Sequence, residues 1–463
     1  MHQNSIPMAT HLIVNAQVVN EGKIYEADVL VKNGRIEKIA AKQTAPHDAV
    51  LIDAAGKYLI PGIIDDQVHF REPGLTHKAN IYTESKAAVA GGVTSFMEMP
   101  NTNPQTLTQD LLEQKYQVAQ ATSLANFSFY MGASNDNYDE VMRTDNTKVC
   151  GLKIFMGSST GNMLVDSEST LEKLFANYEA IISTHCESEA IIKANLAKAK
   201  AQFGEQIPVQ QHPIIRNEEA CYASSSLAVA LAQKHGTRLN VFHISTADEI
   251  ALFQSDVDAN ASCEQVLQAL AKKKISSEIC VHHLYFDASD YDTLGSLIKC
   301  NPAIKAAYHK KALFEAMLNN RLDIIATDHA PHTWEEKQLP NYQAPSGLPL
   351  VQHSLQLLLS FYHQQKISLE KIVEKMCHAP AVLFNVRNRG FIREGYAADL
   401  VLVDVHAPYT VSKANILYKC NWSPLEGKTL TGKVTHTFVN GHLVFNNGAF
   451  DECMNGMRLT FDR

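Results

Sequence analysis

Between residues 63 and 384 the sequence alternates short apolar runs with longer helical patterns, and this alternation constrains the fold more than any other feature. Eight of the runs predict strands, at residues 63–70, 93–99, 127–131, 151–156, 180–185, 239–243, 275–281 and 322–327. Glycines 91, 92 and 236 stand where the intervening helices are expected to end. Eight strands alternating with helices over ~320 residues predict an α/β fold of the (β/α)₈ TIM-like barrel type, although a doubly wound open sheet gives the same alternation.

The two ends of the chain share a different pattern, made of short β-branched runs separated by tight turns. Asn33-Gly34 and Asn440-Gly441 each separate two such runs, and Asn-Gly is the preferred dipeptide of two-residue hairpins. We therefore predict one small composite β-sandwich domain, built from residues 1–62 and 385–463, beside a barrel of residues 63–384.

Composition limits the classes of function and the compartment. The chain has 463 residues, of which 45% are hydrophobic and 19% charged, so it is expected to fold rather than remain disordered. A formal net charge of −8 gives no support for nucleic-acid binding. No apolar run is long enough for a membrane span, and no secretory signal is expected. Nine cysteines with no C-x-x-C spacing predict a reducing, cytoplasmic compartment.

Polar side chains stand at the carboxyl ends of five predicted strands. His69 follows the first strand, Lys153 lies in the fourth, His185 and His243 end the fifth and sixth, and Asp328 follows the eighth. Strand ends of a barrel meet at one mouth, where catalytic groups gather. Imidazoles and carboxylates that converge there suit Zn²⁺ or another borderline divalent metal.

Each of these residues also has a purely structural interpretation. A single histidine at a strand end is more often a packing or hydrogen-bonding residue, and Asp328 could cap a helix. Lys153 stands within an apolar strand, where a buried ammonium is costly unless it is paired or neutralised. Carbamylation by CO₂ and a buried Lys–Asp ion pair are the two alternatives. The five residues together are far more specific than any one of them.

Several motifs, in this order along the chain, resemble those of the cyclic amidohydrolases, and of the dihydroorotases among them. They are Pro61–Gly74, Met99–Thr102, Gly151–Lys153, His185, His243–Ser245, Lys299–Pro302, Thr327–His332 and Gly395–Val401. The resemblance covers nearly the whole chain. It implies reversible, metal-dependent hydrolysis of the cyclic amide of dihydroorotate to N-carbamoyl-aspartate, a step of de novo pyrimidine (UMP) biosynthesis.

The resemblance also implies roles for individual residues. The metal ligands would be His69, Lys153 as a carboxylated bridge, His185, His243 and Asp328, with one or two Zn²⁺ ions per chain. Asp328 would also carry the proton. The substrate would be held by Arg71, Asn101, Asn301 and His332, and by the backbone of Ser346 and Gly347.

One position departs from the family pattern. Related chains carry two histidines on the first strand, whereas here the first of them is Gln67. An amide oxygen is a poorer ligand for zinc than an imidazole. The metal site shared by His69 and Asp328 is therefore expected to be weaker than the other. Asp66 is expected to point to the opposite face of the strand and not to replace Gln67.

Other functions remain as alternatives. Arg71 suits the ring carboxylate of dihydroorotate, because its guanidinium is a planar fork, but it could instead form a structural ion pair with Glu72 or Asp65. Allantoinase, dihydropyrimidinase and hydantoinase act on similar rings. Gln67 also leaves open an inactive dihydroorotase-like partner of aspartate transcarbamoylase. A homo-oligomer, either a dimer or a tetramer, is expected in each case.

Overall fold

The computed structural model describes residues 9–158, 161–340 and 342–463, and among these residues parallel strands form a closed barrel. The barrel strands are β6 (Ile63–Val68), β7 (Val93–Glu98), β8 (Asn126–Phe129) continued by β9 (Met131–Gly132), β10 (Leu152–Phe155), β11 (Ile182–His185), β12 (Leu239–Val241), β13 (Ile275–Cys280) and β14 (Ile324–Ala326). A parallel bridge between Val68 and His329 joins the last strand to the first. The barrel prediction is confirmed, and closure excludes the open sheet.

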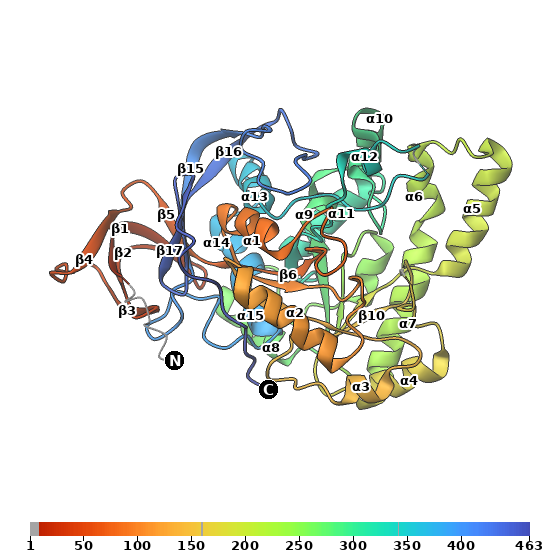
Figure 1. The fold of residues 1–463 in the computed structure, drawn as a ribbon, viewed down its shortest axis with the longest axis horizontal. Helices are drawn as coiled ribbons and strands as arrows, with labels where there is room; N and C mark the ends of the chain where they lie inside the picture. Colours follow the sequence, from red (N-terminus) through yellow and green to blue (C-terminus); the bar gives the residue numbers. More distant parts are fainter. Residues whose placement is uncertain (1–8, 159–160, 341) are drawn as a thin grey trace.

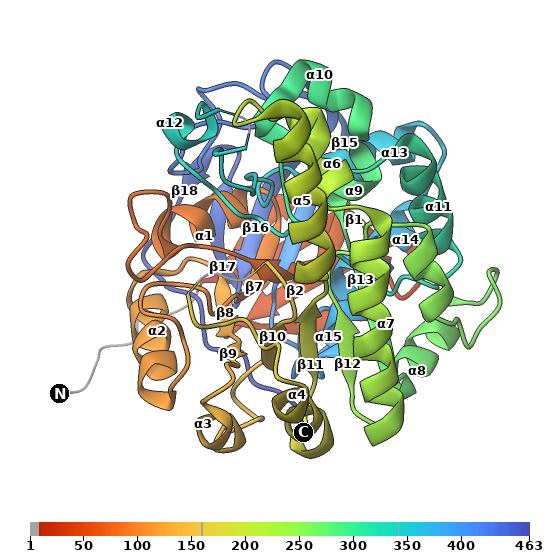
Figure 2. The same ribbon diagram turned by 90° about the vertical axis from the view of Figure 1, so that its right-hand side faces the viewer.

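Helices cover the outside of the barrel (Figure 2). They are α1 (Ile81–Ala90), α2 (Gln109–Thr122), α3 (Tyr138–Met142), α4 (Glu168–Asn177), α5 (Glu189–Phe203), α6 (His212–Ile215), α7 (Glu218–His235), α8 (Cys263–Lys272), α9 (Val281–Tyr285), α10 (Tyr291–Leu294), α11 (Ala307–Leu318), α12 (Trp334–Lys337), α13 (Ser354–His363), α14 (Leu369–Val373) and α15 (Ala379–Leu383). Short 3-10 turns lie at Val209–Gln211, Asp248–Leu252, Ala288–Asp290 and Gly295–Ile298, and a π-helical turn at Glu374–His378. As expected, Gly91 and Gly236 end helices α1 and α7, and Gly236 does so with a φ of 69°.

Strands from both ends of the chain share one nine-stranded sheet beside the barrel (Figure 1). They are β1 (Thr10–Asn20), β2 (Lys23–Lys32), β3 (Arg35–Ala40), β4 (Ala49–Asp53), β5 (Tyr58–Pro61), β15 (Leu400–Thr410), β16 (Thr429–Val439), β17 (His442–Asn446) and β18 (Ala449–Phe450). The antiparallel pair β5–β15 joins the two ends. Both Asn-Gly turns are hairpins in which all four residues have a positive φ.

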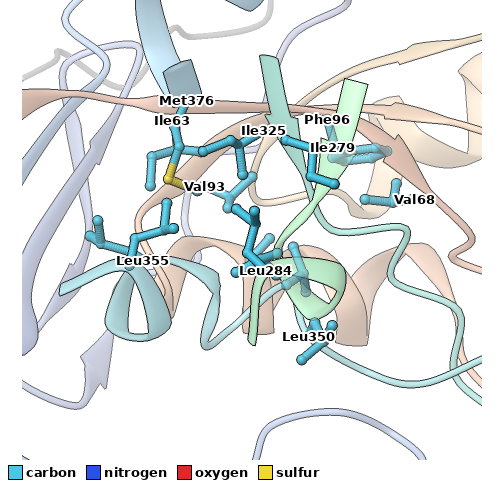
Figure 3. Close-up of a cluster of buried hydrophobic side chains, with 14 of the residues drawn as sticks. Ile63, Val68, Val93, Phe96, Ile279, Leu284, Ile325, Leu350, Leu355 and Met376 are labelled. Atoms are coloured by element: carbon cyan, nitrogen blue, oxygen red, sulfur yellow. The ribbon is translucent and has the colours of Figure 1, made fainter. Parts of the chain in front are cut away.

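Apolar side chains fill the space between the barrel strands and the surrounding helices (Figure 3). Ile63 and Val93 on neighbouring strands meet Leu284 of α9 and Leu355 of α13, and Ile325 of β14 packs beside them. A second buried cluster includes Phe461, near the chain end. After the sheet, the last residues of the chain run along the barrel. There the Leu459 N–H donates to the Phe127 carbonyl of β8 at 2.9 Å.

None of the helices in the described part of the chain is long and apolar enough to cross a membrane. All nine cysteines are free thiols, and seven of them are buried.

Candidate active site

One cavity of about 250 Å³ opens where the carboxyl ends of the barrel strands meet. All the site residues predicted from the sequence line it: His69, Arg71, Asn101, Lys153, His185, His243, Asn301, Asp328, His332, Ser346 and Gly347. Gln67, Phe155, Ser158, Ala330 and Pro345 complete the lining. The residues converge because parallel barrel strands all end at the same rim.

His69, which follows β6, faces an oxygen atom with each of its ring nitrogens. Its Nε2 lies 3.1 Å from Oδ1 of Asp328, and its Nδ1 lies 2.9 Å from Oδ1 of Asn101. Burial lowers the pKa of His69 despite the neighbouring carboxylate. A neutral ring carries one N–H and can satisfy only one of the two oxygens. A cation between Nε2 and Asp328 would resolve the remaining contact.

Asp328 faces the cavity rather than capping a helix. Burial by itself would raise the pKa of this carboxyl group, but hydrogen bonding and charge interaction with His69 hold it below its ordinary value. Asp65, two strand positions before Gln67, accepts hydrogen bonds from the backbone and side chain of Thr327 at 3.2 and 2.6 Å. These bonds fix the segment that carries Asp328 against β6.

His185 and His243 form the second group of donors. Their rings lie 4.5 Å apart between centroids, and burial lowers the pKa of both. Nε2 of His185 lies 2.8 Å from Oε2 of Glu187, which leaves Nδ1 for another partner. The buried Nδ1 of His243 has no hydrogen-bond partner among the described residues.

Lys153 lies on β10 with its ammonium group between two aromatic rings. Its Nζ is 4.7 Å from the ring centroid of Phe155 and 4.2 Å from that of Phe242. Burial lowers the pKa of Lys153 to about 7, although Asp328 and Glu278 oppose that shift. No ion pair among the described residues includes Lys153. The described residues therefore do not contain the Lys–Asp pair that the sequence left open.

Arg71 stands at the rim with its guanidinium group in the cavity lining. Its Nε–H donates to the Pro331 carbonyl at 3.1 Å, and its Nη2 lies 3.1 Å from Nε2 of His332. The alternative of a structural ion pair between Arg71 and Glu72 or Asp65 is not found among the described residues. The Glu72 carboxylate accepts a hydrogen bond from the Ile81 N–H instead. Lys78 donates to Nδ1 of His332 at 3.1 Å, so two cationic side chains meet one imidazole.

The Ser346–Gly347 segment is held by two buried lysines. Lys337 donates to the carbonyls of Pro345 and Gly347, each at 2.9 Å, and Lys299 donates to that of Ala344 at 2.6 Å. The Gly347 N–H itself donates to the Lys299 carbonyl. A side chain at Gly347 would come within 2.4 Å of the Ala330 carbonyl oxygen, so only glycine lets this segment approach the cavity.

Four lining residues hold a left-handed backbone, which non-glycine residues rarely adopt. The φ angles are 69° at Arg71, 51° at Ser158, 39° at His243 and 45° at Asp328. Such conformations cost roughly 1–3 kcal/mol each and persist where the surrounding structure imposes them. Each of these residues lies two or three positions after the end of a barrel strand, with its side chain in the cavity lining.

Gln67 lines the cavity, and a sulfur atom stands beside its amide. Sγ of Cys280 lies 3.6 Å from its Oε1. Asp66 does not line the cavity; its carboxyl group lies against that of Glu278, and burial raises the pKa of Asp66 to about 8. As expected, Asp66 does not take the place of Gln67.

The donor set fits a divalent metal ion. The imidazoles of His69, His185 and His243 and the carboxylate of Asp328 line the same small cavity, and this is the ligand chemistry that zinc prefers. A cation would give the unpartnered Nδ1 of His243 a partner. It would also satisfy whichever oxygen of Asp328 or Asn101 the single N–H of His69 leaves without a donor.

The sequence analysis did not identify the residues that support these side chains. Glu187 stands two residues after His185, and a carboxylate at that spacing is a usable signal for an outer partner of a histidine ligand. Arg216, whose Nη1 lies 2.6 Å from Oε2 of Glu187, carries no local signal. Lys337 also escapes sequence analysis, because a lysine in a short helix is normally exposed.

Comparison with known proteins agrees with this geometry. Residues 58–444 match the amidohydrolase family. A dihydroorotase from Halobacterium salinarum is 30% identical over 410 residues, which cover 86% of this chain and 91% of that protein. An allantoinase from Desulfitobacterium hafniense is 31% identical over 448 residues, covering 94% and 95%. The solved L-hydantoinase (dihydropyrimidinase) of Arthrobacter aurescens superposes with a TM-score of 0.89 at 26% identity, over 98% and 100% of the two chains. The chain belongs to the amidohydrolase family.

Proposed function

We propose that this protein is a dihydroorotase, which interconverts dihydroorotate and N-carbamoyl-aspartate. The observation that carries the proposal is a single cavity lined both by the metal-type donors and by Arg71. Dihydroorotate carries a ring carboxylate, which a guanidinium group recognises through paired hydrogen bonds. Relatives named dihydroorotase that span most of this chain support the same conclusion.

The proposed ligands are His69, Lys153, His185, His243 and Asp328, and the proposed ions are one or two Zn²⁺ per chain. Bound ions of this kind polarise an amide carbonyl and lower the pKa of water towards ~7. Asp328 accepts the proton of the attacking water at its carboxylate and delivers it to the leaving ring nitrogen. In ring closure Asp328 moves the same proton in the opposite direction.

Lys153 is proposed to carry a carbamate. Its neutral amine forms a C–N bond to CO₂ and releases one proton, and the product is a carboxylate that can bridge two cations. The aromatic surroundings of Nζ, which hold no paired carboxylate among the described residues, support this proposal. Native mass spectrometry of the metal-loaded enzyme should show the added CO₂. An unmodified lysine in an active enzyme would contradict the carbamate.

Arg71, Asn101, Asn301 and His332 are proposed to hold the substrate, with backbone contacts from Ser346 and Gly347. The buried Oδ1 of Asn301 has no hydrogen-bond partner among the described residues and is available to a ring N–H. The Asn101 side chain already accepts from His69, so it would also orient that ring. Because Gly347 uses both of its backbone polar groups within the protein, its proposed contribution is mainly the shape of the cavity.

Arg71→Ala tests the recognition of the carboxylate. Losing one partner of a buried charge-assisted pair should lower kcat/KM for dihydroorotate. The loss of transition-state stabilisation should be about 2–4 kcal/mol. Activity on hydantoin, which lacks the carboxylate, should change much less. Arg143→Ala is the matched control, because Arg143 is exposed and pairs only with Glu140. Equal losses on both substrates would contradict the role given to Arg71.

Allantoinase is the second candidate, because a relative with that name is 31% identical over 94% of this chain. Turnover of dihydroorotate, allantoin and hydantoin by the purified, zinc-loaded protein distinguishes the candidates. We expect dihydroorotate to be turned over far more efficiently than allantoin or hydantoin. Preference for allantoin would replace the proposal, and inactivity on all three would favour the inactive partner of aspartate transcarbamoylase.

We further propose a cytoplasmic homo-oligomer, either a dimer or a tetramer, that can associate with aspartate transcarbamoylase. The relationship to the amidohydrolase family and the nine free thiols support this proposal. Analytical ultracentrifugation, with and without that enzyme, tests both assemblies, and a monomer at micromolar concentration would contradict the first.

A further inference from the structure

A cysteine and two histidines meet where β13 ends and α9 begins. Cys280 is the last residue of β13, and His282 and His283 belong to the helix that follows directly. Sγ of Cys280 and one nitrogen of each ring all lie within 4.8 Å of one another. All three side chains are buried, and none of them lines the main cavity.

The histidines of this cluster leave ring nitrogens without partners. Nδ1 of His283 and both nitrogens of His282 are buried without a well-formed hydrogen bond among the described residues, although the Thr327 backbone lies beside the His282 ring. Nε2 of His283 lies 3.2 Å from the Pro302 carbonyl, to which its N–H donates. That bond leaves the lone pair of Nδ1 unused. Buried polar nitrogens are nearly always satisfied in native proteins, so these point to a missing ligand.

The donor types and their spacing suit zinc. One thiol and two imidazoles are ligands that structural zinc sites combine. Zn–S and Zn–N bonds of roughly 2.3 and 2.1 Å place tetrahedral donors about 3.5 Å apart, so movements of about 1 Å would close the cluster on an ion. A histidine that donates its second ring N–H to a backbone carbonyl, as His283 does, is the usual arrangement of a metal ligand.

We propose that Cys280, His282 and His283 bind a zinc-class ion, in a site separate from the donor set of the main cavity. Binding forms a metal–sulfur bond and releases the thiol proton of Cys280. Sγ of Cys280 also lies 3.3 Å from Oε1 of Glu278 and 3.6 Å from the amide oxygen of Gln67. The ion would tie the end of β13 to the first turn of α9. The site does not depend on the proposed reaction, because it is defined by its own three ligands.

Cobalt substitution tests this site without measuring activity. The metal-free full-length protein is titrated with Co²⁺, and a cysteine ligand should produce a near-ultraviolet thiolate-to-cobalt charge-transfer band. Cys280→Ser should abolish the band and lower the bound cobalt by one ion per chain. Cys377→Ser is the matched control, since Cys377 is equally buried but bonds to the Pro61 carbonyl, away from the cluster. His185→Ala, which alters the main cavity, should also leave the band in place.

His282→Gln and His283→Gln provide a second route if Cys280→Ser fails to fold. Each should weaken Co²⁺ binding at this site at least tenfold and shift the visible cobalt spectrum, while the circular dichroism of the variant stays that of the parent. A wild-type protein without the charge-transfer band would overturn the proposal. A band that survives in Cys280→Ser, or one that Cys377→Ser removes, would overturn it equally.

Discussion

At the scale of single residues, Glu187 controls how His185 is presented. Its buried Oε2 lies 2.8 Å from Nε2 of His185 and 2.6 Å from Nη1 of Arg216, and it also accepts from the Ser158 hydroxyl at 2.8 Å. Burial alone would raise the pKa of Glu187, but Arg216 and His185 hold it below its ordinary value. The charged carboxylate fixes both the tautomer and the orientation of the ring.

Glu187→Gln should therefore weaken metal binding in the main cavity by roughly 10–100-fold, since outer partners of ligands contribute about that much. The amide is nearly the same size but leaves the Arg216 guanidinium without its counter-charge. Competition of zinc with a chelator measures the change. Glu189→Gln is the control, because Glu189 bonds the Ser158 N–H but does not contact His185. Equal affinities in the two variants would show that Glu187 is merely structural.

Gln67 stands where the resemblance to the cyclic amidohydrolases implies a histidine. Gln67→His should strengthen the weaker of two metal sites, because an imidazole replaces a neutral amide oxygen. Apart from the separate ion proposed at Cys280, His282 and His283, calorimetric zinc titration should show two unequal affinities in the parent, or a single tight site. In the variant the weak affinity should approach the strong one, and the strong affinity should not change. Two indistinguishable affinities in the parent would contradict this assignment.

At the scale of elements, helix α12 positions the loop that closes one side of the cavity. Lys337 of that helix is buried and donates to carbonyls of the loop at Pro345 and Gly347. Its ammonium group thus satisfies backbone carbonyls that have no strand or helix partner. The Trp422 indole N–H donates to the His332 carbonyl at 2.7 Å, which adds a contact from the segment between β15 and β16.

Lys337→Met should loosen this loop while the chain still folds. The substitution keeps the length of the side chain but leaves buried carbonyls unsatisfied, at a cost of about 1–3 kcal/mol for each. We expect a higher KM with a smaller change in kcat, together with faster amide hydrogen exchange in residues 342–347. Lys311→Met on the exposed face of α11 is the matched control. Unchanged exchange rates in Lys337→Met would contradict the role of this lysine.

At the scale of the whole molecule, the chain end fastens the barrel and the sheet together. Phe461 is fully buried, and its N–H donates to the Thr147 carbonyl at 2.9 Å. Arg463 donates to the carbonyls of Cys150 and Phe384 at 2.7 and 3.0 Å. We propose that residues 1–62 and 385–463 form one domain, whose last residues extend across to the barrel.

Phe461→Ala should lower the free energy of unfolding by about 3–5 kcal/mol, because it opens a cavity in a fully buried cluster. Urea denaturation followed by circular dichroism measures the loss. Phe450→Ala is the matched control, since Phe450 lies half-buried on the edge strand β18 and should cost clearly less. A loss for Phe461→Ala no larger than that of the control would show that the chain end is dispensable.

Local patterns were sufficient to predict the barrel strands, the hairpin turns and the five polar residues at strand ends, whereas the substrate-binding residues came from the resemblance to the cyclic amidohydrolases. Strand length, Asn-Gly turns and the order of polar residues after strands are properties of short segments, and they persist in any fold that contains those segments. The topology of a barrel brings its strand ends together, so locating the strands in the sequence also located the mouth at which the site lies.

Only the tertiary structure decided which buried polar groups support one another. Adjacent residues Asp328 and His329 diverge: Asp328 meets His69, while His329 turns away and lies 2.8 Å from the Glu84 carboxylate on α1. Arg216 reaches Glu187 across 29 positions, and Cys280 reaches Gln67 across 213. Such contacts depend on how strands and helices pack, and no periodicity within a short segment encodes them.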